Sequence, residues 1–500
     1  MTKAAIDRSA PPPSGEVHPF RFPRFVRGRL PSGVSAYAAR LPGVPLASVE
    51  LLAAAGAQHD PAGREGLATL TAGLLDEGAA GRDAMEIAGG IERLGGQIAT
   101  GADWDSGYAG ILLLSRHLEA GLRLVSEVAT APAFPEAEVE RLRRQRLTEL
   151  LRRRHQPAAV ADEQLAAAIY QGTVYAHSPL GTEAAISSLR RDEILDFYRR
   201  RYRLPEAILI AVSDLDPETL LAAAGAALAA APTVSAAAGD SGGGAGGPET
   251  AGAAGGGAAG TAAGGAAGAE SGETAGAGTW GPADIRPAPL AGLRVVVIDR
   301  AGAAQTELRL GHAAVPRAHP DFTTLTFLNT LLGGKFTSRI NLNLRERHGY
   351  TYGAATRFSG RLGPGPFVVS AAVATESAGA AAREVLSELR RIRDEPVTRE
   401  EMEETRSYML GVFPYTVQSM GDLARRLADL AVYGLPDDHY DRYLRAIASL
   451  SRADVQEAAR RHLDPDRLAI VAVGPADPLR GQLDGLGEVV VRSADDLTLI

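Results

Sequence analysis

Two side chains in the second half of the chain place a cation and a phenol at short spacing. Arg345 and Tyr352 are seven residues apart in the segment Leu344-Arg-Glu-Arg-His-Gly-Tyr-Thr-Tyr-Gly353. We expect Arg345 in the last turn of a helix, Gly349 as the left-handed stop of that helix, and Tyr352 on the strand that follows. A guanidinium and a phenol that reach one carbonyl oxygen can stabilise a developing oxyanion, or they can anchor a peptide main chain.

Both side chains also have an ordinary structural interpretation. Arg345 can pair with a neighbouring carboxylate, as surface arginines commonly do. Tyr352 alternates with Tyr350 and Ala354 along the predicted strand, and this pattern would place its ring in the core. The residues alone leave both interpretations open.

The second informative segment is a helix predicted at residues 66–78. An apolar stripe typical of core packing runs along it, made of Leu67, Leu70, Leu74 and Leu75. Core packing does not explain Gly73, because a glycine inside a helix costs about 1 kcal/mol relative to alanine. Further along, residues 100–106 are expected either to form an ordinary sheet edge or to accept an extended peptide by strand addition.

The composition restricts the chemistry. A chain of 500 residues is expected to form two or more domains. It has no cysteine, which excludes disulfides, thiolate metal sites and cysteine nucleophiles. Its net charge of −8 argues against a general nucleic-acid binder. The absence of an apolar run near the N-terminus, or of any 18-residue apolar run, predicts a cytoplasmic protein without a membrane span, or a periplasmic one if the true start lies upstream.

A change in composition divides the chain into similar parts. Residues 235–279 are almost wholly Ala, Gly, Ser, Thr and Glu, a composition that predicts a flexible linker. We therefore expect a disordered tail at 1–17, a first domain at 18–232, a linker at 233–283 and a second domain at 284–500.

The two domains look like repeats of each other. A helix at Ser188–Ile194 precedes an apolar strand at Ala207–Val212, and a helix at Ser449–Val455 precedes an apolar strand at Leu468–Val473, at the same offset. We also predict further strands and long amphipathic helices, namely strands Leu46–Ala53 and Gln305–Leu310, helices at 321–347, and helices Pro135–Arg154 and Arg399–Val412. Each half is thus expected to be an α+β domain, a mostly antiparallel sheet with helices on one face, and the two halves to form a clamshell.

At this point the chain resembles the pitrilysin/insulinase family of metallopeptidases, the inverzincins, which includes the mitochondrial processing peptidases. The resemblance rests on the order of five segments across the two halves: the helix at 66–78, Gly95–Asp103, His177–Thr182, Asn329–Arg339 and Leu344–Gly353.

This resemblance implies a zinc helix with an inverted His-x-x-Glu-His motif and a downstream glutamate as third ligand. On this sequence the motif falls on Thr69, Ala72 and Gly73, and the third-ligand region falls near Glu149. Threonine is a poor neutral donor, and alanine and glycine have no side-chain donor. We therefore expect no bound metal and no catalytic residue in this chain alone, and small residues that face an empty cleft.

The resemblance also implies a role for the first pair of residues. The family uses an arginine and a tyrosine at the spacing of Arg345 and Tyr352 to hold substrate over the zinc. We accordingly expect a metal-free, peptide-binding subunit of a heterodimeric zinc metallopeptidase, whose partner of the same family carries the zinc and the intact motif, with no nucleic-acid or membrane partner. A purely structural scaffold subunit and a stand-alone peptide-binding protein remain as alternatives.

Overall fold

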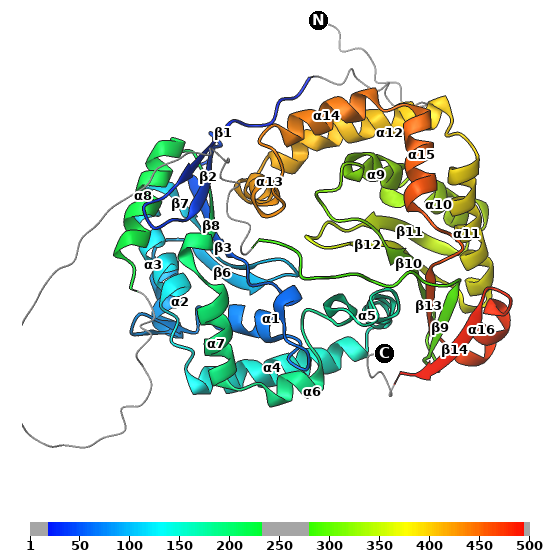
Figure 1. Ribbon diagram of the computed structural model, residues 1–500, viewed down its shortest axis with the longest axis horizontal. Helices are drawn as coiled ribbons and strands as arrows, with labels where there is room; N and C mark the ends of the chain where they lie inside the picture. The colour runs from blue at the N-terminus through cyan, green and yellow to red at the C-terminus, as the bar shows by residue number, and fades with distance from the viewer. Residues whose placement is uncertain (1–18, 233–279, 495–500) are drawn as a thin grey trace, which may run out of the picture.

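The computed structural model describes residues 19–232 and 280–494, and these residues form two α+β halves as the sequence predicted (Figure 1). The predicted tail at 1–17 and most of the predicted linker at 233–283 lie outside the described residues. Among the described helices, none is long and apolar enough to cross a membrane.

The first half is built on a six-stranded sheet. Its strand order is β1 (Phe25–Arg29), β2 (Ser35–Arg40), β8 (Ile208–Ser213), β3 (Leu46–Ala53), β7 (Gly107–Leu114) and β6 (Gln97–Ala102). Neighbouring strands are antiparallel except β2 and β8, which run parallel. Strand β6 is therefore an edge of this sheet.

The second half repeats this arrangement. Its strand order is β14 (Glu488–Ser493), β9 (Arg294–Asp299), β13 (Ala469–Gly474), β10 (Thr306–Ala313), β12 (Pro366–Val373) and β11 (Thr351–Phe358). From β9 to β11 the order and the strand directions match those from β2 to β6 in the first half. The far edge differs, because β14 comes from the C-terminal segment and runs parallel to β9, whereas β1 runs antiparallel to β2.

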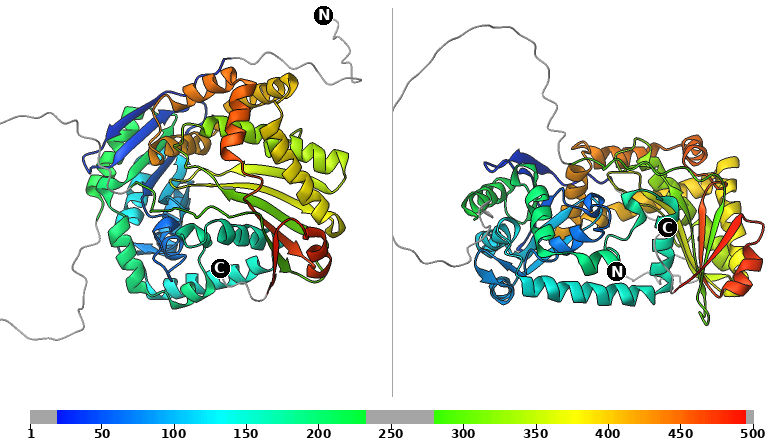
Figure 2. Two further views of the ribbon diagram at one scale, coloured as in Figure 1. Left: turned by 45° about the vertical axis from the view of Figure 1, so that its right-hand side comes forward. Right: turned by 60° about the horizontal axis from the view of Figure 1, so that its bottom comes forward.

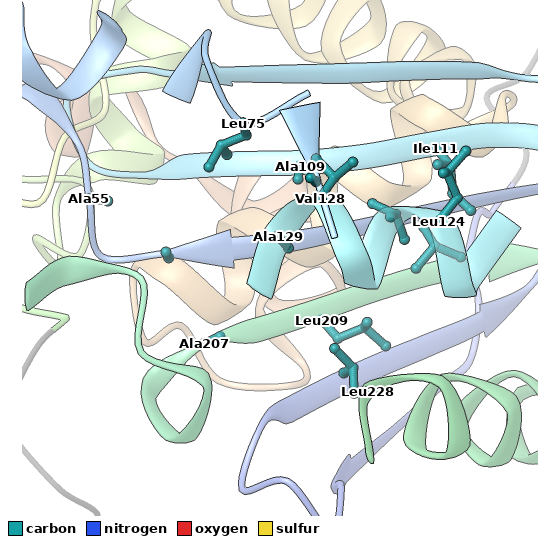
Figure 3. Packing of buried hydrophobic residues seen from close by; sticks show 14 of the residues in the cluster. Ala55, Leu75, Ala109, Ile111, Leu124, Val128, Ala129, Ala207, Leu209 and Leu228 are labelled. Carbon is teal, nitrogen blue, oxygen red and sulfur yellow. The ribbon is translucent and has the colours of Figure 1, made fainter. Parts of the chain in front are cut away.

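Helices cover the outer face of each sheet and bury the main cores. In the first half these are α1 (Leu67–Ala72), α2 (Ala84–Arg93), α3 (Leu118–Thr130), α7 (Arg191–Arg201) and α8 (Pro217–Ala230). Figure 3 shows Leu124 and Val128 of α3 packed over Ala109 and Ile111 of β7. In the second half they include α9 (Phe322–Asn329), α11 (Ala378–Asp394), α15 (Arg452–His462) and α16 (Ala476–Leu483).

The inner face of each sheet is covered by a helix from the other half (Figures 1 and 2). Helix α13 (Met420–Val432) packs on β8 of the first sheet, and α5 (Pro157–Ile169) packs on β13 of the second. Strands β8 and β13 are buried on both faces, which explains why both read as continuous apolar runs in the sequence. Each half thus contributes one helix to the inner face of the other half's sheet. The helices predicted on one face of each sheet are present, and this borrowed helix covers the opposite face.

A half-buried cation lies at the junction between the halves. The Arg361 guanidinium, from the turn between β11 and β12, lies 4.5 Å from the ring centre of Trp104 and 4.4 Å from that of Tyr175. The next residue along, Leu362, donates its backbone N–H to Asp105 at 3.2 Å. Tyr433, the C-cap of α13, donates its hydroxyl to the same carboxylate at 3.1 Å. Burial, followed by the charge of Asp103, raises the pKa of Asp105 to about 6.

Candidate functional site

Helix α1, where the zinc ligands of the resembling family would lie, is shorter than the sequence predicted. It begins after Gly66, which has a φ of +94°, and ends at Ala72 instead of reaching residue 78. The Asp60 carboxylate caps its start by accepting the N–H groups of Gly66 and Ala68, each at 2.7 Å. Gly73 is the C-cap and not an interior residue, so it does not carry the helix penalty that we assigned to it.

Of the three positions expected to face an empty cleft, Thr69 and Ala72 are buried and Gly73 is half-buried. Thr69 is only 6% exposed, and Ala72 is fully buried. The Thr69 hydroxyl donates to the carbonyl of Pro179 at 2.8 Å. A Cβ atom placed on Gly73 would lie 3.3 Å from Cδ2 of Leu142 in α4 (Glu136–Arg154). The expectation of an open cleft was therefore wrong, because α4 and the segment around Pro179 fill the space.

Arg146 on α4 connects Thr69 with the predicted third-ligand position. Its Nη1 donates to the Thr69 hydroxyl at 2.8 Å, and its Nε lies 3.7 Å from Oε2 of Glu149. Burial lowers the pKa of Arg146, and the charge of Glu149 opposes this shift. Because a fixed positive charge stands between the two positions and only Glu149 offers a carboxylate, these residues do not fit a zinc ion.

The second half arranges Arg345 and Tyr352 as the sequence predicted. Arg345 lies in the last turn of the π-helical segment η6 (Leu342–Arg347). Gly349 adopts the left-handed conformation at φ +66° and donates its N–H to the Arg345 carbonyl at 3.1 Å. Tyr352 follows on strand β11, which is the edge of its sheet.

A β-bulge turns Tyr352 away from the core. The register between β11 and β12 shifts between Thr351 and Ala354, so strict alternation along β11 is broken there. As a result Thr351 is buried, whereas Tyr352 is 90% exposed. The alternative that Tyr352 is a core residue is excluded by this exposure.

Phe336 links the two predicted residues. The guanidinium of Arg345 stacks over the ring of Phe336 at 4.3 Å from its centre, and Phe336 itself is 64% exposed. Phe336 and Tyr352 line one groove of about 550 Å³, together with Tyr408. The only carboxylate recorded in an ion pair with Arg345 is its exposed neighbour Glu346, at 3.5 Å, among the residues that the structure describes.

The cations that line this groove are neutralised. Lys335, whose side chain is 7% exposed, lies 3.4 Å from Glu404. Arg309 on β10 lies 2.5 Å from Asp162 on the borrowed helix α5 and 2.8 Å from Glu307. The groove thus presents aromatic surface and main-chain groups, with little unbalanced charge.

An acidic cavity of about 510 Å³ occupies the equivalent place in the first half, between its sheet and α13. Glu50 on β3 pairs with Ile210 as Arg309 on β10 pairs with Val471, so the two halves carry opposite charges at one position of the repeat. Burial, followed by the charge of Asp103, raises the pKa of Glu50, and Arg425 opposes this shift. This cavity was not predicted, since its residues come together only when α13 crosses to the other half.

Strand β6 borders the acidic cavity and strand β11 borders the groove, and each is an edge strand of its sheet. The edge strand predicted at residues 100–106 is β6, at Gln97–Ala102. It ends before the predicted range does, where the Asp103 carboxylate accepts the N–H groups of Asp105 and Ser106 and forms a turn.

Besides the residues of the acidic cavity, sequence reasoning missed Phe336, Tyr408 and Arg146. Phe336 follows the Gly333-Gly334 pair, so an aromatic residue soon after a helix break was the available signal. Arg146 lies one helical turn before Glu149, a spacing that brings two side chains of a helix together.

Family models match most of the chain. The model "Insulinase (Peptidase family M16)" matches residues 38–183, and the model "Peptidase M16 inactive domain" matches residues 188–409. The chain belongs to peptidase family M16. The zinc-helix positions of this M16 chain lie in the range of the first model, and the groove with Arg345 and Tyr352 lies in the range of the second.

Solved structures share the M16 fold. A peptidase M16 inactive domain from Pseudomonas fluorescens is 24% identical, superposes with a TM-score of 0.75, and covers 90% of this chain and 98% of its own. A protease from Helicobacter pylori is 18% identical, with a TM-score of 0.76, and covers 91% of this chain and 100% of its own. At these identities the likeness concerns the fold alone. No protein with a curated function matches the sequence.

Proposed function

We propose that this chain is the subunit without the catalytic zinc in a two-chain M16 metallopeptidase, in which it holds peptide substrate for a partner of the same family that carries that zinc. One observation carries the proposal: Tyr352 is almost fully exposed on an edge strand beside a groove, while the zinc-helix positions of the same chain are packed shut. Tyr352, Phe336 and Tyr408 are all exposed around this one groove, and an exposed aromatic patch of this kind points to a ligand more than to a structural role.

The form of the groove supports an extended peptide as that ligand. Among the described residues strand β11 is the edge of its sheet, and a further strand could add there, although the N–H groups of Gly353 and Ala354 already bond Thr351 and Asn341. Phe336, Tyr352 and Tyr408 add sequence-tolerant apolar contacts, and Arg345, which stacks on Phe336, places a cation beside the groove whose one ion pair among the described residues is to an exposed carboxylate. Main-chain recognition of this kind suits peptides of many sequences.

The test is affinity purification of the full chain from its own cells, with zinc and peptidase activity measured in the eluate. We expect a second M16 chain with an intact inverted motif, bound zinc, and peptide cleavage. Arg345→Ala and Tyr352→Phe should each lower kcat/KM of the assembled complex by roughly 100-fold, the loss typical of removing one oxyanion donor.

Two matched controls separate a local effect from a general one. Arg347→Ala removes an exposed arginine from the same helical segment, and Tyr415→Phe alters an exposed tyrosine elsewhere on the second half. Both should leave activity unchanged. An active complex that tolerates Arg345→Ala and Tyr352→Phe would establish the scaffold alternative. Recovery of the chain alone, without peptidase activity, would contradict the obligate complex and leave the stand-alone peptide-binding protein.

A further inference from the structure

Two histidines and an aspartate meet on the outer side of the second half, away from the zinc-helix positions. His319 and Asp321 precede α9, and His462 is the last residue of α15. One potential ligand atom of each lies within 4.8 Å of the others, and all three side chains are half-buried. The rings of His319 and His462 lie edge to face, with their centres 5.2 Å apart.

We propose that His319, Asp321 and His462 form a binding site for a divalent transition metal of the zinc class. Two imidazoles and one carboxylate are ligand types that zinc prefers, and three protein ligands with water in the fourth position make a complete tetrahedral shell. The proposal does not depend on the peptidase role proposed above, because no residue of this site belongs to the groove.

The hydrogen bonds at the site are those of the metal-free protein, and some of them must break when a metal binds. His462 Nε2 lies 2.7 Å from Asp321 Oδ2, a hydrogen-bond distance that must lengthen on binding, because two ligands about 2.0–2.1 Å from a tetrahedral ion lie farther apart. The backbone N–H of Asp321 donates to Nδ1 of His319 at 3.1 Å, so this nitrogen is an acceptor in the metal-free protein and the ring must give up this bond when a metal binds. The other carboxylate oxygen of Asp321 has no hydrogen-bond partner among the described residues.

Arg461 is the one competitor for the site among the described residues. Its Nη1 donates to Asp321 Oδ2 at 2.7 Å, and a cation in this place opposes a second cation. The same guanidinium also bonds Glu457 at 3.1 Å, and its side chain is half-exposed. Arg461 can therefore release Asp321 and retain an ion pair, which makes a metal at Asp321 compatible with the rest of the network.

A metal at this site would join two segments that are far apart in the sequence. Helix α9 continues directly into the π-helical segment η5 (Thr330–Gly334), which is followed by Lys335 and Phe336 in the groove. Bound metal would hold the start of this helical unit against α15 and thereby stabilise the second half. We expect zinc to raise the Tm of the protein.

The experiment is a zinc titration of the tag-free full chain after treatment with a chelator. Stoichiometry is measured by elemental analysis after gel filtration, and coordination is measured from the visible absorption of the Co²⁺-substituted protein. The wild type should bind one equivalent of zinc. His319→Gln and His462→Gln should weaken binding at least tenfold and should abolish the rise in Tm. In the second variant the glutamine amide can still donate a hydrogen bond to Asp321.

His155→Gln is the matched control, because His155 is an exposed histidine at the end of α4 with no place in the cluster. This variant should bind zinc as the wild type does. The proposal is overturned if the wild type binds no zinc and gives no cobalt absorption bands, a result that needs no variant to fold. It is equally overturned if His319→Gln and His462→Gln, folded by circular dichroism, bind zinc as tightly as the wild type.

Discussion

In the first half of the molecule, the helix face on which the family carries its zinc ligands is covered by α4, and Arg146 bonds Thr69 beside Glu149. In the second half, a bulge holds Tyr352 in water, and Arg345 rests on the exposed ring of Phe336. The zinc-helix positions of the first half are thus covered by other side chains, whereas the aromatic residues of the groove in the second half are exposed. An exposed aromatic residue gives no packing energy, so its exposure is the more informative of the two observations.

The inner faces of the two sheets differ in the same way. Arg309 is neutralised by Asp162 from the helix that the first half contributes. Glu50, at the equivalent position, faces an open cavity without a hydrogen-bond or ion-pair partner among the described residues. Because both halves share strand order, this difference comes from the borrowed helices and not from the sheets.

The largest expected effect on stability comes from placing the metal ligands of the family at the covered positions of the first half. The triple variant Thr69→His/Ala72→Glu/Gly73→His would bury a carboxylate and force a side chain against Leu142 of α4. We expect a loss of about 4 kcal/mol or more in the free energy of unfolding. Urea denaturation measures this loss. Zinc content is measured in a His319→Gln background, and a stable variant that binds zinc there would show that the first half remains open.

A pH titration of stability compares two capping carboxylates, one in each half. Burial raises the pKa of Asp60 to about 7, although the N–H groups of Ala68 and Gly66 oppose the shift. The folded state holds this proton more tightly than the unfolded chain, whose pKa is about 3.9. The stability from Asp60 is therefore full below about pH 4 and is lost as the pH rises through about 7. Asp60→Asn should flatten that decline.

Glu401, which caps α12 (Arg399–Val412), should behave in the opposite way. Burial alone would raise its pKa, but hydrogen bonds from Arg339 and from the backbone of Thr398 lower it to about 2. Its contribution to stability is present above the unfolded pKa of about 4.3 and is lost as the pH falls toward 2. Denaturation of Glu401→Gln between pH 2 and 5 checks this. Equal slopes for both variants would contradict the contrast.

Substitution of Arg146, which bonds the Thr69 hydroxyl in the first half, should have a smaller effect on stability. Arg146→Ala leaves the buried Thr69 hydroxyl without its donor and should cost about 1–2 kcal/mol in unfolding free energy. Arg144→Ala removes an exposed arginine from the same helix and should change stability by less than about 0.5 kcal/mol. If the two variants are equally stable, Arg146 does not contribute to the packing that covers the zinc-helix positions.

The smallest effect on stability is expected in the groove. Tyr352→Ala should change the unfolding free energy by no more than about 0.5 kcal/mol, because the ring gives up almost no buried surface. Thermal unfolding of the free chain measures it. A loss above about 1 kcal/mol would show that Tyr352 serves packing, and the contrast between the halves would fail.

Much of the fold followed from local patterns in the sequence. Strand Leu46–Ala53 and helix Arg399–Val412, with its Thr398 capping box, have the predicted limits. Helix 66–78 was predicted too long, because its leucine stripe continues past Ala72 while the backbone turns at Gly73. The place of Tyr352 in an exposed position was not predictable from alternation, since a bulge shifts the register by a residue that no sequence period marks.

The sequence by itself determined the elements, the repeat of the two halves and the lack of zinc donors at Thr69, Ala72 and Gly73, because propensity, periodicity and ligand chemistry depend on residue type. Only the tertiary structure decided which of these positions are open. The exchange of α5 and α13 creates the cavity at Glu50 and neutralises Arg309, and α4 closes the zinc-helix face. Exposure is a property of contacts between segments distant in sequence, and such contacts form only when the chain packs.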